Sequence, residues 1–273
     1  MIAPTALITG GSSGIGLAIS EQLIAKGYQI FSVSRNPGRG PKTPNFVPLE
    51  FDLFDLDKIA EFSEDFMKQH GVPEILINNA GYGAFYDWAS FPEEQIVKQS
   101  NLLFTSPVLL CRYFAPAMQQ RGSGTILNLS SLATLYPLPF MPLYNAGKSA
   151  LSSFTESMML EYFDCPKFID FRMGDVRTKF NQSARVQARW EQSSSMKKAW
   201  DRIEWQLERS PSAKTAADQI LKTIEYGKSG RFYGGGFFHR VFLPLIRPIF
   251  FRNINNFILR RYYEVKNREI ENF

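Results

Sequence analysis

The chain has 273 residues, of which 44% are hydrophobic and 21% are charged, and its formal net charge is +5. This composition is typical of a globular protein with a substantial core, and no low-complexity segment interrupts it. The two cysteines lack the spacing of a zinc site or a disulfide framework, so we expect no bound metal and a reducing compartment.

Short apolar runs alternate with amphipathic stretches, which predicts strand and helix units around a parallel sheet. A strand at 5–9 enters a glycine-rich turn, and a helix follows from about 15 to 26. The next strands are expected at 29–34, 46–51 and 74–77. A long helix at 93–120, bent near Pro107, then leads to strands at 125–129 and 168–172.

The turn after the first strand has the sequence TGGSSGIG, from Thr9 to Gly16. Its glycines let the backbone approach a pyrophosphate, and the free N–H groups and positive dipole end of the next helix point at that group. The candidate cofactor contacts in this turn are Gly10, Ser12, Ser13, Gly14, Ile15 and Gly16. The sequence therefore predicts a dinucleotide site.

The residue after the second strand indicates which dinucleotide is bound. NAD sites usually place a carboxylate there, whereas the 2′-phosphate of NADP needs a cation. Here Ser34 is followed by Arg35, and an arginine fork suits a phosphate. A solvated loop arginine is the alternative, but the pattern favours NADP over NAD.

Tyr144 and Lys148 are one helical turn apart, so an ammonium lies beside a phenol if this stretch is helical. The ammonium favours the ionised phenol and is expected to lower the pKa of Tyr144, which suits a general acid and base. Ser131 lies upstream, where the strand at 125–129 ends, and could hydrogen-bond the same carbonyl oxygen. Ser130 is a competing serine. The Tyr and Lys spacing is common, so the pair gains meaning only from its neighbours.

In chain order, these motifs resemble those of the short-chain dehydrogenase/reductase superfamily, over about residues 6–224. Between the glycine turn and Tyr144 lie Asp52-Leu53, the N-N-A-G run that ends at Gly81, and an asparagine in the long helix. The chain departs from the pattern at Met173, where proline is usual, and at Thr134, where glycine is frequent.

The resemblance implies one Rossmann-like, doubly wound α/β sheet with helices on both faces. It also implies a catalytic tetrad of Asn101, Ser131, Tyr144 and Lys148. Tyr144 would pass its proton to the carbonyl oxygen and Ser131 would polarise that oxygen. Lys148 would bind the nicotinamide ribose, and Asn101 would hold a relay water. The remaining cofactor contacts that it implies are Asp52, Leu53, Asn79, Ala80, Gly81 and Thr178.

The substrate side is largely apolar. Seven of the apolar residues between Ser131 and Tyr144 either form the wall of a hydrophobic pocket or pack a loop, namely Leu132, Leu135, Tyr136, Pro137, Leu138, Phe140 and Met141. A polar, helix-prone insertion at 179–211 is the expected substrate lid. Its three tryptophans, Trp190, Trp200 and Trp205, are expected to pack helices rather than contact ligand.

The last segment, 234–273, is a basic aromatic extension of a catalytic domain at 1–233. It holds seven Arg or Lys against three Glu, so most of the excess positive charge lies there. Residues 237–263 are too often interrupted by arginine and proline to span a bilayer. They could lie in a membrane interface, fold over the substrate cleft or form an oligomer contact.

The leading hypothesis is an NADP(H)-dependent oxidoreductase that reduces a hydrophobic ketone or aldehyde, with an acyl-chain, retinoid or steroid-like substrate. The alternative is a non-catalytic dinucleotide-sensing or scaffold protein on the same fold. The resemblance suggests a homo-dimer or tetramer built through the helices of Asn101 and Tyr144. No signal peptide is evident, so a cytoplasmic protein is expected. Nucleic-acid binding is poorly supported, and neither His70 nor His239 receives a role.

Overall fold

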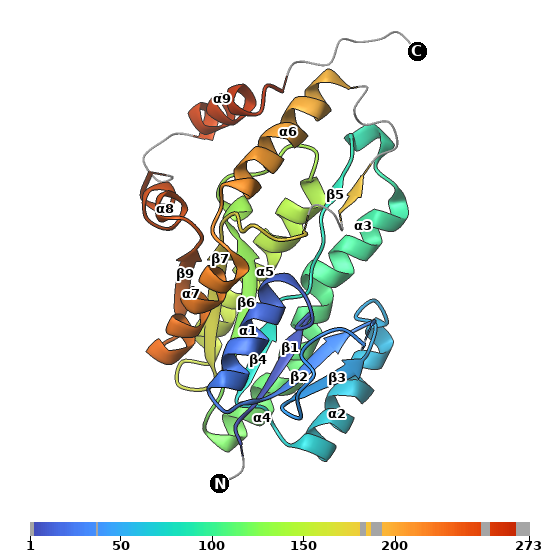
Figure 1. Cartoon of the computed structure of the whole chain (residues 1–273), viewed down its shortest axis with the longest axis vertical. Helices are drawn as coiled ribbons and strands as arrows, with labels where there is room; N and C mark the ends of the chain where they lie inside the picture. The colour runs from blue at the N-terminus through green and yellow to red at the C-terminus, as the bar shows by residue number, and fades with distance from the viewer. Residues whose placement is uncertain (1–2, 37, 181–183, 187–192, 247–251, 266–273) are drawn as a thin grey trace.

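The structure is a computed structural model that describes residues 3–36, 38–180, 184–186, 193–246 and 252–265 (Figure 1). The predicted lid and C-terminal extension therefore lie partly outside the described residues, and Trp190 lies wholly outside them. Within the described ranges, no helix is long and apolar enough to cross a membrane.

Seven parallel strands form one sheet in the order β3-β2-β1-β4-β6-β7-β9. The strands are β1 (Thr5–Thr9), β2 (Gln29–Ser34), β3 (Phe46–Glu50), β4 (Ile75–Asn78), β6 (Thr125–Ser131), β7 (Lys167–Met173) and β9 (Gly230–Gly234). The strand order reverses at β1, because β2 and β3 lie on one side of it and β4 on the other. In such sheets the carboxyl ends of the strands at this point form the usual ligand crevice. The predicted doubly wound α/β fold is confirmed.

Helices cover both faces of the sheet. One face packs against α1 (Gly14–Ala25) and α7 (Ala213–Tyr226), and the other against α2 (Ile59–His70), α4 (Ser106–Arg121) and α5 (Pro142–Glu161). Side chains alternate along a strand, so Ala6 and Ile8 of β1 enter the first core while Leu7 enters the second. This alternation requires strands that are apolar on both faces, as Ala6, Leu7 and Ile8 of β1 are.

The predicted long helix at 93–120 is interrupted. It consists of α3 (Glu93–Ser100), a π-helical segment (Asn101–Thr105) and α4. Pro107 lies in the first turn of α4, where its missing N–H breaks no intrahelical hydrogen bond. The irregular segment thus begins at Asn101 and ends two residues before the proline. Gly147 of α5 faces the same segment, because a Cβ there would lie 2.8 Å from Cβ of Leu103.

A further layer lies over the carboxyl ends of the strands (Figure 1). It contains α6 (Ser194–Glu208), a π-helical segment (Phe238–Phe242), α8 (Leu243–Ile246) and α9 (Arg252–Tyr262), and α6 and α9 run side by side. Lys198 of α6 pairs with Glu264 at 2.6 Å. Trp200 and Tyr263 join a separate apolar cluster that also includes Phe85 of the short strand β5 (Ala84–Phe85), which pairs with β8 (Arg185–Val186).

Candidate active site

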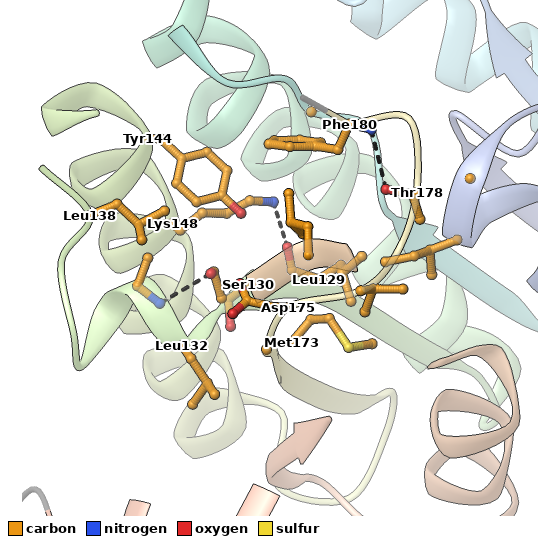
Figure 2. A pocket seen from close by; sticks show the side chains of 18 of the residues that line it. Leu129, Ser130, Leu132, Leu138, Tyr144, Lys148, Met173, Asp175, Thr178 and Phe180 are labelled. Atoms are coloured by element: carbon orange, nitrogen blue, oxygen red, sulfur yellow. Dashed lines mark hydrogen bonds between the residues drawn. The ribbon is translucent and has the colours of Figure 1, made fainter. Parts of the chain in front are cut away.

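A cavity of about 530 Å³ lies at the carboxyl ends of the central strands (Figure 2). Its lining comes from the β1–α1 turn, the loops after β4, β6 and β7, helices α5 and α6, and the C-terminal segment. The predicted site residues that line it are Gly10, Ser13, Gly14, Ile15, Asn79, Ala80, Gly81, Ser131, Tyr144, Lys148 and Thr178. The sheet topology therefore brings most of the predicted motifs to one place.

The glycine turn forms one end of the cavity. Gly10 and Gly14 have φ values of +69° and +53°, which side chains rarely adopt. Gly16 permits a close approach, since a Cβ there would lie 2.2 Å from the carbonyl oxygen of Gly10. Asn79 ties the turn to the end of β4, because its Nδ2 donates to the carbonyl oxygen of Thr9 at 2.9 Å. The turn is thereby held with the N-terminus of α1 at the cavity.

Tyr144 and Lys148 project from α5 into the cavity side by side, as the helical spacing predicts (Figure 2). Nζ of Lys148 donates to the carbonyl oxygen of Leu129 at 2.6 Å. Burial lowers the pKa of Lys148 to about 8, and the charge of Asp170 partly opposes this effect. The ammonium is thus held in place, and its charge can change near neutral pH.

The pKa of Tyr144 is raised from its ordinary value, contrary to the expectation that Lys148 would lower it. Burial of the phenol has the largest effect, and the negative charge of Asp175 adds to it. A hydrogen bond with Ser131 acts in the opposite direction. Helical spacing alone does not reveal this balance, because it gives no measure of how deeply the phenol is buried.

Ser131 and Ser130 end β6 with different partners. Oγ of Ser131 accepts from the backbone N–H of Ala133 at 3.1 Å and joins the hydrogen bond with Tyr144. Ser130 donates instead to the buried carboxylate of Asp170, which also accepts from Ser152 at 2.6 Å. Of the two serines, Ser131 is therefore the partner of Tyr144.

Six predicted site residues are not among those that line the described cavity, namely Ser12, Gly16, Arg35, Asp52, Leu53 and Asn101. The guanidinium of Arg35 lies over the ring of Phe54, 5.6 Å from its centre. The carbonyl oxygens of Leu53 and Asn101 both accept from Ser106 Oγ, at 2.5 and 2.9 Å. Arg39, which the sequence did not single out, does line the cavity.

The wall opposite the glycine turn is mostly apolar. Four of the bulky residues between Ser131 and Tyr144 line it, namely Leu132, Tyr136, Leu138 and Met141. The lid contributes Ile203, Gln206 and Leu207 from α6, but neither Trp200 nor Trp205. Trp200 is buried against Phe85, with the ring centres 4.9 Å apart. Trp200 therefore packs as expected, whereas Trp205 neither lines the cavity nor is buried, being 45% exposed.

The C-terminal segment also lines the cavity, through His239, Leu243 and Tyr263. Nε2 of His239 lies 3.7 Å from Oδ2 of Asp175. Burial raises the pKa of Asp175, and the charge of His239 partly opposes this effect. Neither residue was predicted from the sequence to take part in the site. The acidic side chain of Asp175, directly after Gly174, could have indicated its place in the site from the sequence. The contact with His239 could not, because His239 lies far along the chain from Asp175.

This fold and site define a class of α/β protein with a dinucleotide turn and a Tyr, Lys and Ser group around one cavity. The family model described as short chain dehydrogenase matches residues 4–187. The chain belongs to this short-chain dehydrogenase family.

Curated relatives resemble the chain over part of their length. An uncharacterized oxidoreductase of Schizosaccharomyces pombe is 32% identical over 58% of this chain and 54% of its own length. A 3-ketodihydrosphingosine reductase of Bacteroides thetaiotaomicron is 28% identical over 66% of each protein. The match thus spans about half to two thirds of these relatives.

Solved structures share the fold. A short-chain dehydrogenase from Streptomyces avermitilis has a TM-score of 0.76 at 23% identity, covering 86% of this chain and 88% of that one. An alcohol dehydrogenase from Thermococcus sibiricus in complex with 5-hydroxy-NADP has a TM-score of 0.68 at 18% identity, covering 87% of this chain and 98% of that one. A 4-hydroxyisoleucine dehydrogenase in complex with NADH has a TM-score of 0.71 at 20% identity, covering 84% of this chain and 96% of that one.

Proposed function

We propose that the protein is an NADP(H)-dependent oxidoreductase that interconverts a carbonyl group and an alcohol, chiefly by reducing a hydrophobic ketone or aldehyde. The observation that carries this proposal is the position of Tyr144, Lys148 and Ser131 on one cavity that also contains the glycine turn. An acid and base beside a dinucleotide turn suits hydride chemistry at a carbonyl carbon.

The residues present fit a nicotinamide dinucleotide. Gly14 is the first residue of α1 and lies at the cavity. Gly16 lies so close to Gly10 that position 16 has room only for a hydrogen atom and not for a side chain. Backbone N–H groups at this helix end suit a pyrophosphate. When bound, the cofactor would supply or accept the hydride. Asn79, Ala80, Gly81 and Thr178 would line its path, and Asp52 and Leu53 would lie near the adenine.

Two arginines support the preference for NADP. Arg35 follows β2, where a 2′-phosphate would be read, and Arg39 lines the cavity nearby in sequence. Either guanidinium could make a two-pronged contact with a phosphate. NAD-type sites place a carboxylate after the second strand, and Ser34 and Arg35 are not acidic.

Each catalytic side chain has a distinct task in this mechanism. Tyr144 holds the proton at its hydroxyl oxygen and gives it to the carbonyl oxygen of the substrate, while Ser131 donates a second hydrogen bond to that oxygen. The positive charge of Lys148 stabilises the phenolate left behind and would also bind the nicotinamide ribose. Asn101, at the start of the π-helical segment, would hold a water that returns the proton.

The substrate is proposed to carry a bulky apolar part. Leu132, Leu138 and Met141 on one side and Ile203 and Leu207 on the other leave an apolar space next to Tyr144. The similar Bacteroides protein bears the name of a reductase of 3-ketodihydrosphingosine. An acyl-chain ketone is therefore the first substrate class to test, ahead of retinoid or steroid-like carbonyls.

Tyr144→Phe tests the mechanism. NADPH oxidation with a panel of long-chain ketones and aldehydes should be lost by at least about a hundredfold, because general acid catalysis contributes this much. NADPH binding, measured by the change in its fluorescence, should persist. Retained turnover would contradict the mechanism. A wild-type protein that binds NADPH but reduces no carbonyl would favour the dinucleotide-sensing alternative.

Arginine variants test the cofactor. Arg35→Ala and Arg39→Ala should each weaken NADPH binding by about tenfold or more, while NADH binding changes little. The reason is that only NADPH has a 2′-phosphate that loses its contact with arginine. Lys42→Ala, in the same loop but not lining the cavity, is the control. Equal losses for both cofactors would assign the arginines to folding instead.

We further propose that the protein forms a homo-dimer or tetramer through α4 and α5. Two apolar side chains at the end of the α5 region support this arrangement, since Leu160 is 83% and Phe163 is 81% exposed.

The segment 237–263 is proposed to contact a membrane interface. Its outward side chains, among them Phe237, Phe238 and Phe257, combine aromatic rings with nearby arginines.

A further inference from the structure

Asp175 is the one acidic residue that lines the cavity, as far as the described chain shows. It lies two residues after the end of β7 and extends into the same space as Tyr144 and Leu132 (Figure 2). The reaction proposed above gives this carboxylate no task. A carboxylate in a largely apolar substrate cavity calls for a partner, because burial of a charge without one is costly.

One imidazole and three phenols are among the groups that interact with Asp175. His239 lies 3.7 Å away, which is an ion-pair distance rather than a hydrogen bond. The charge of Asp175 raises the pKa of Tyr144, Tyr262 and Tyr263, so all three phenols lie within its electrostatic reach. Of these phenols, Tyr144 and Tyr263 line the same cavity as Asp175, whose ion pair with His239 is a long one.

The contact with His239 is not needed to hold the C-terminal segment in place. The backbone N–H of Gly174 donates to Gly234 at 3.0 Å. The side chain of Gln219 bonds both the N–H and the carbonyl of Gly235, at 2.8 and 3.0 Å. Together these bonds fix the start of the segment independently of Asp175.

A carboxylate beside aromatic rings has the chemistry that recognises an ammonium group. The carboxylate supplies charge-assisted hydrogen bonds, and the ring faces attract the cation. Apolar walls formed by Leu132, Leu138 and Leu207 adjoin this point and suit a hydrocarbon part of the same molecule. With a neutral substrate Asp175 keeps its 3.7 Å ion pair with His239, whereas an ammonium would add a direct charge-assisted contact.

We propose that Asp175 is the counter-ion for an ammonium group on the substrate, so that the site selects amino ketones with an apolar chain over neutral ketones of equal length. This inference rests on the proposed function and deepens it. Tyr144 would serve the carbonyl oxygen while Asp175 holds the amine.

A series of long-chain 2-amino ketones tests this proposal, with the N-acetylated amine and the 2-hydroxy ketone as neutral analogues. We expect the wild type to prefer the amine by about tenfold or more in kcat/KM, which is the size expected for a charge-assisted contact. Asp175→Asn should abolish that preference, lowering kcat/KM of the amine by about tenfold more than that of the 2-hydroxy ketone, because both substrates share any effect on the pKa of Tyr144.

Binding is measured separately from turnover. In the Tyr144→Phe background, calorimetry should show that the matching long-chain amino alcohol loses affinity on Asp175→Asn, while its N-acetyl form does not. His239→Gln is the control, and it should keep the preference for the amine because the carboxylate remains.

Three outcomes would overturn the proposal. They are equal binding of the amine and its N-acetyl form, equal losses of both on Asp175→Asn, and loss of the preference in His239→Gln alone. A wild type that reduces no carbonyl would instead refute the proposed function. The calorimetric comparison would then still decide the role of Asp175.

Discussion

Lys148 shows how a single buried charge links stability to pH. Burial lowers its pKa in the folded protein to about 8, whereas a lysine in an unfolded chain titrates near ~10.4. Between these values the unfolded chain binds more protons than the folded protein. The free energy of unfolding therefore rises with pH across this window, and the penalty is fully present below about pH 8.

Lys148→Met removes this penalty. Relative to wild type, the variant should gain stability at pH 7, and about 2 kcal/mol of that gain should disappear by pH 9.5. Loss of the hydrogen bond to Leu129 lowers the stability of the variant at both pH values, so the difference between them is the quantity to measure. Urea unfolding at the two pH values gives it, with the exposed Lys98→Met as control. A gain that does not vary with pH would contradict the assignment of a buried ammonium.

At the scale of elements, Gly16 determines how closely α1 can approach the end of β1. A methyl group at this position would lie 2.2 Å from the carbonyl oxygen of Gly10 and 2.6 Å from Nδ2 of Asn79. Gly16→Ala should therefore cost about 1–3 kcal/mol of stability, as overpacking does, and should weaken NADPH binding as the turn shifts. Gly38→Ala is the matched control, because nothing lies within 4 Å of its added Cβ. Equal thermal midpoints for the two variants would contradict the close contact.

The sequence predicted the regular elements well where the spacing of apolar residues and the positions of glycines indicate the same boundaries, as in β1, α1 and β2. It missed β9, whose five residues begin and end with glycine, and the predicted domain boundary after residue 233 falls inside that strand. It also missed the pairing of Asp175 with His239, because two residues so far apart in sequence meet only through the path of the C-terminal segment. The raised pKa of Tyr144 was beyond reach for a similar reason, since burial depends on the whole fold.

At the scale of the whole molecule, the C-terminal segment has two faces. His239, Leu243 and Tyr263 point into the cavity, which is one of the arrangements that the sequence left open. Phe237, Phe238 and Leu245 of the same segment are more than half exposed, as is Phe257 of α9. A segment that lines the cavity with one face and exposes aromatic rings on the other could deliver hydrophobic substrate from a bilayer to Tyr144. Residues 247–251 of the proposed membrane contact lie outside the described chain.

The membrane contact of the outward face can be tested with point variants of the full chain. Truncation after residue 230 is unsuitable, because it would remove most of β9. We expect the full chain to float with vesicles that contain anionic lipid, and less so with neutral vesicles or high salt, because Arg240, Arg260 and Arg261 are exposed near the aromatic rings. Phe238→Glu combined with Phe257→Glu should reduce the floating fraction by about fivefold or more, since a buried phenylalanine contributes up to ~3 kcal/mol. Val97→Glu, an equally exposed apolar position on α3, is the control and should not change flotation. Equal flotation of the double variant and the control would refute the membrane contact, while unchanged NADPH oxidation with a water-soluble ketone would show that the cavity itself is intact.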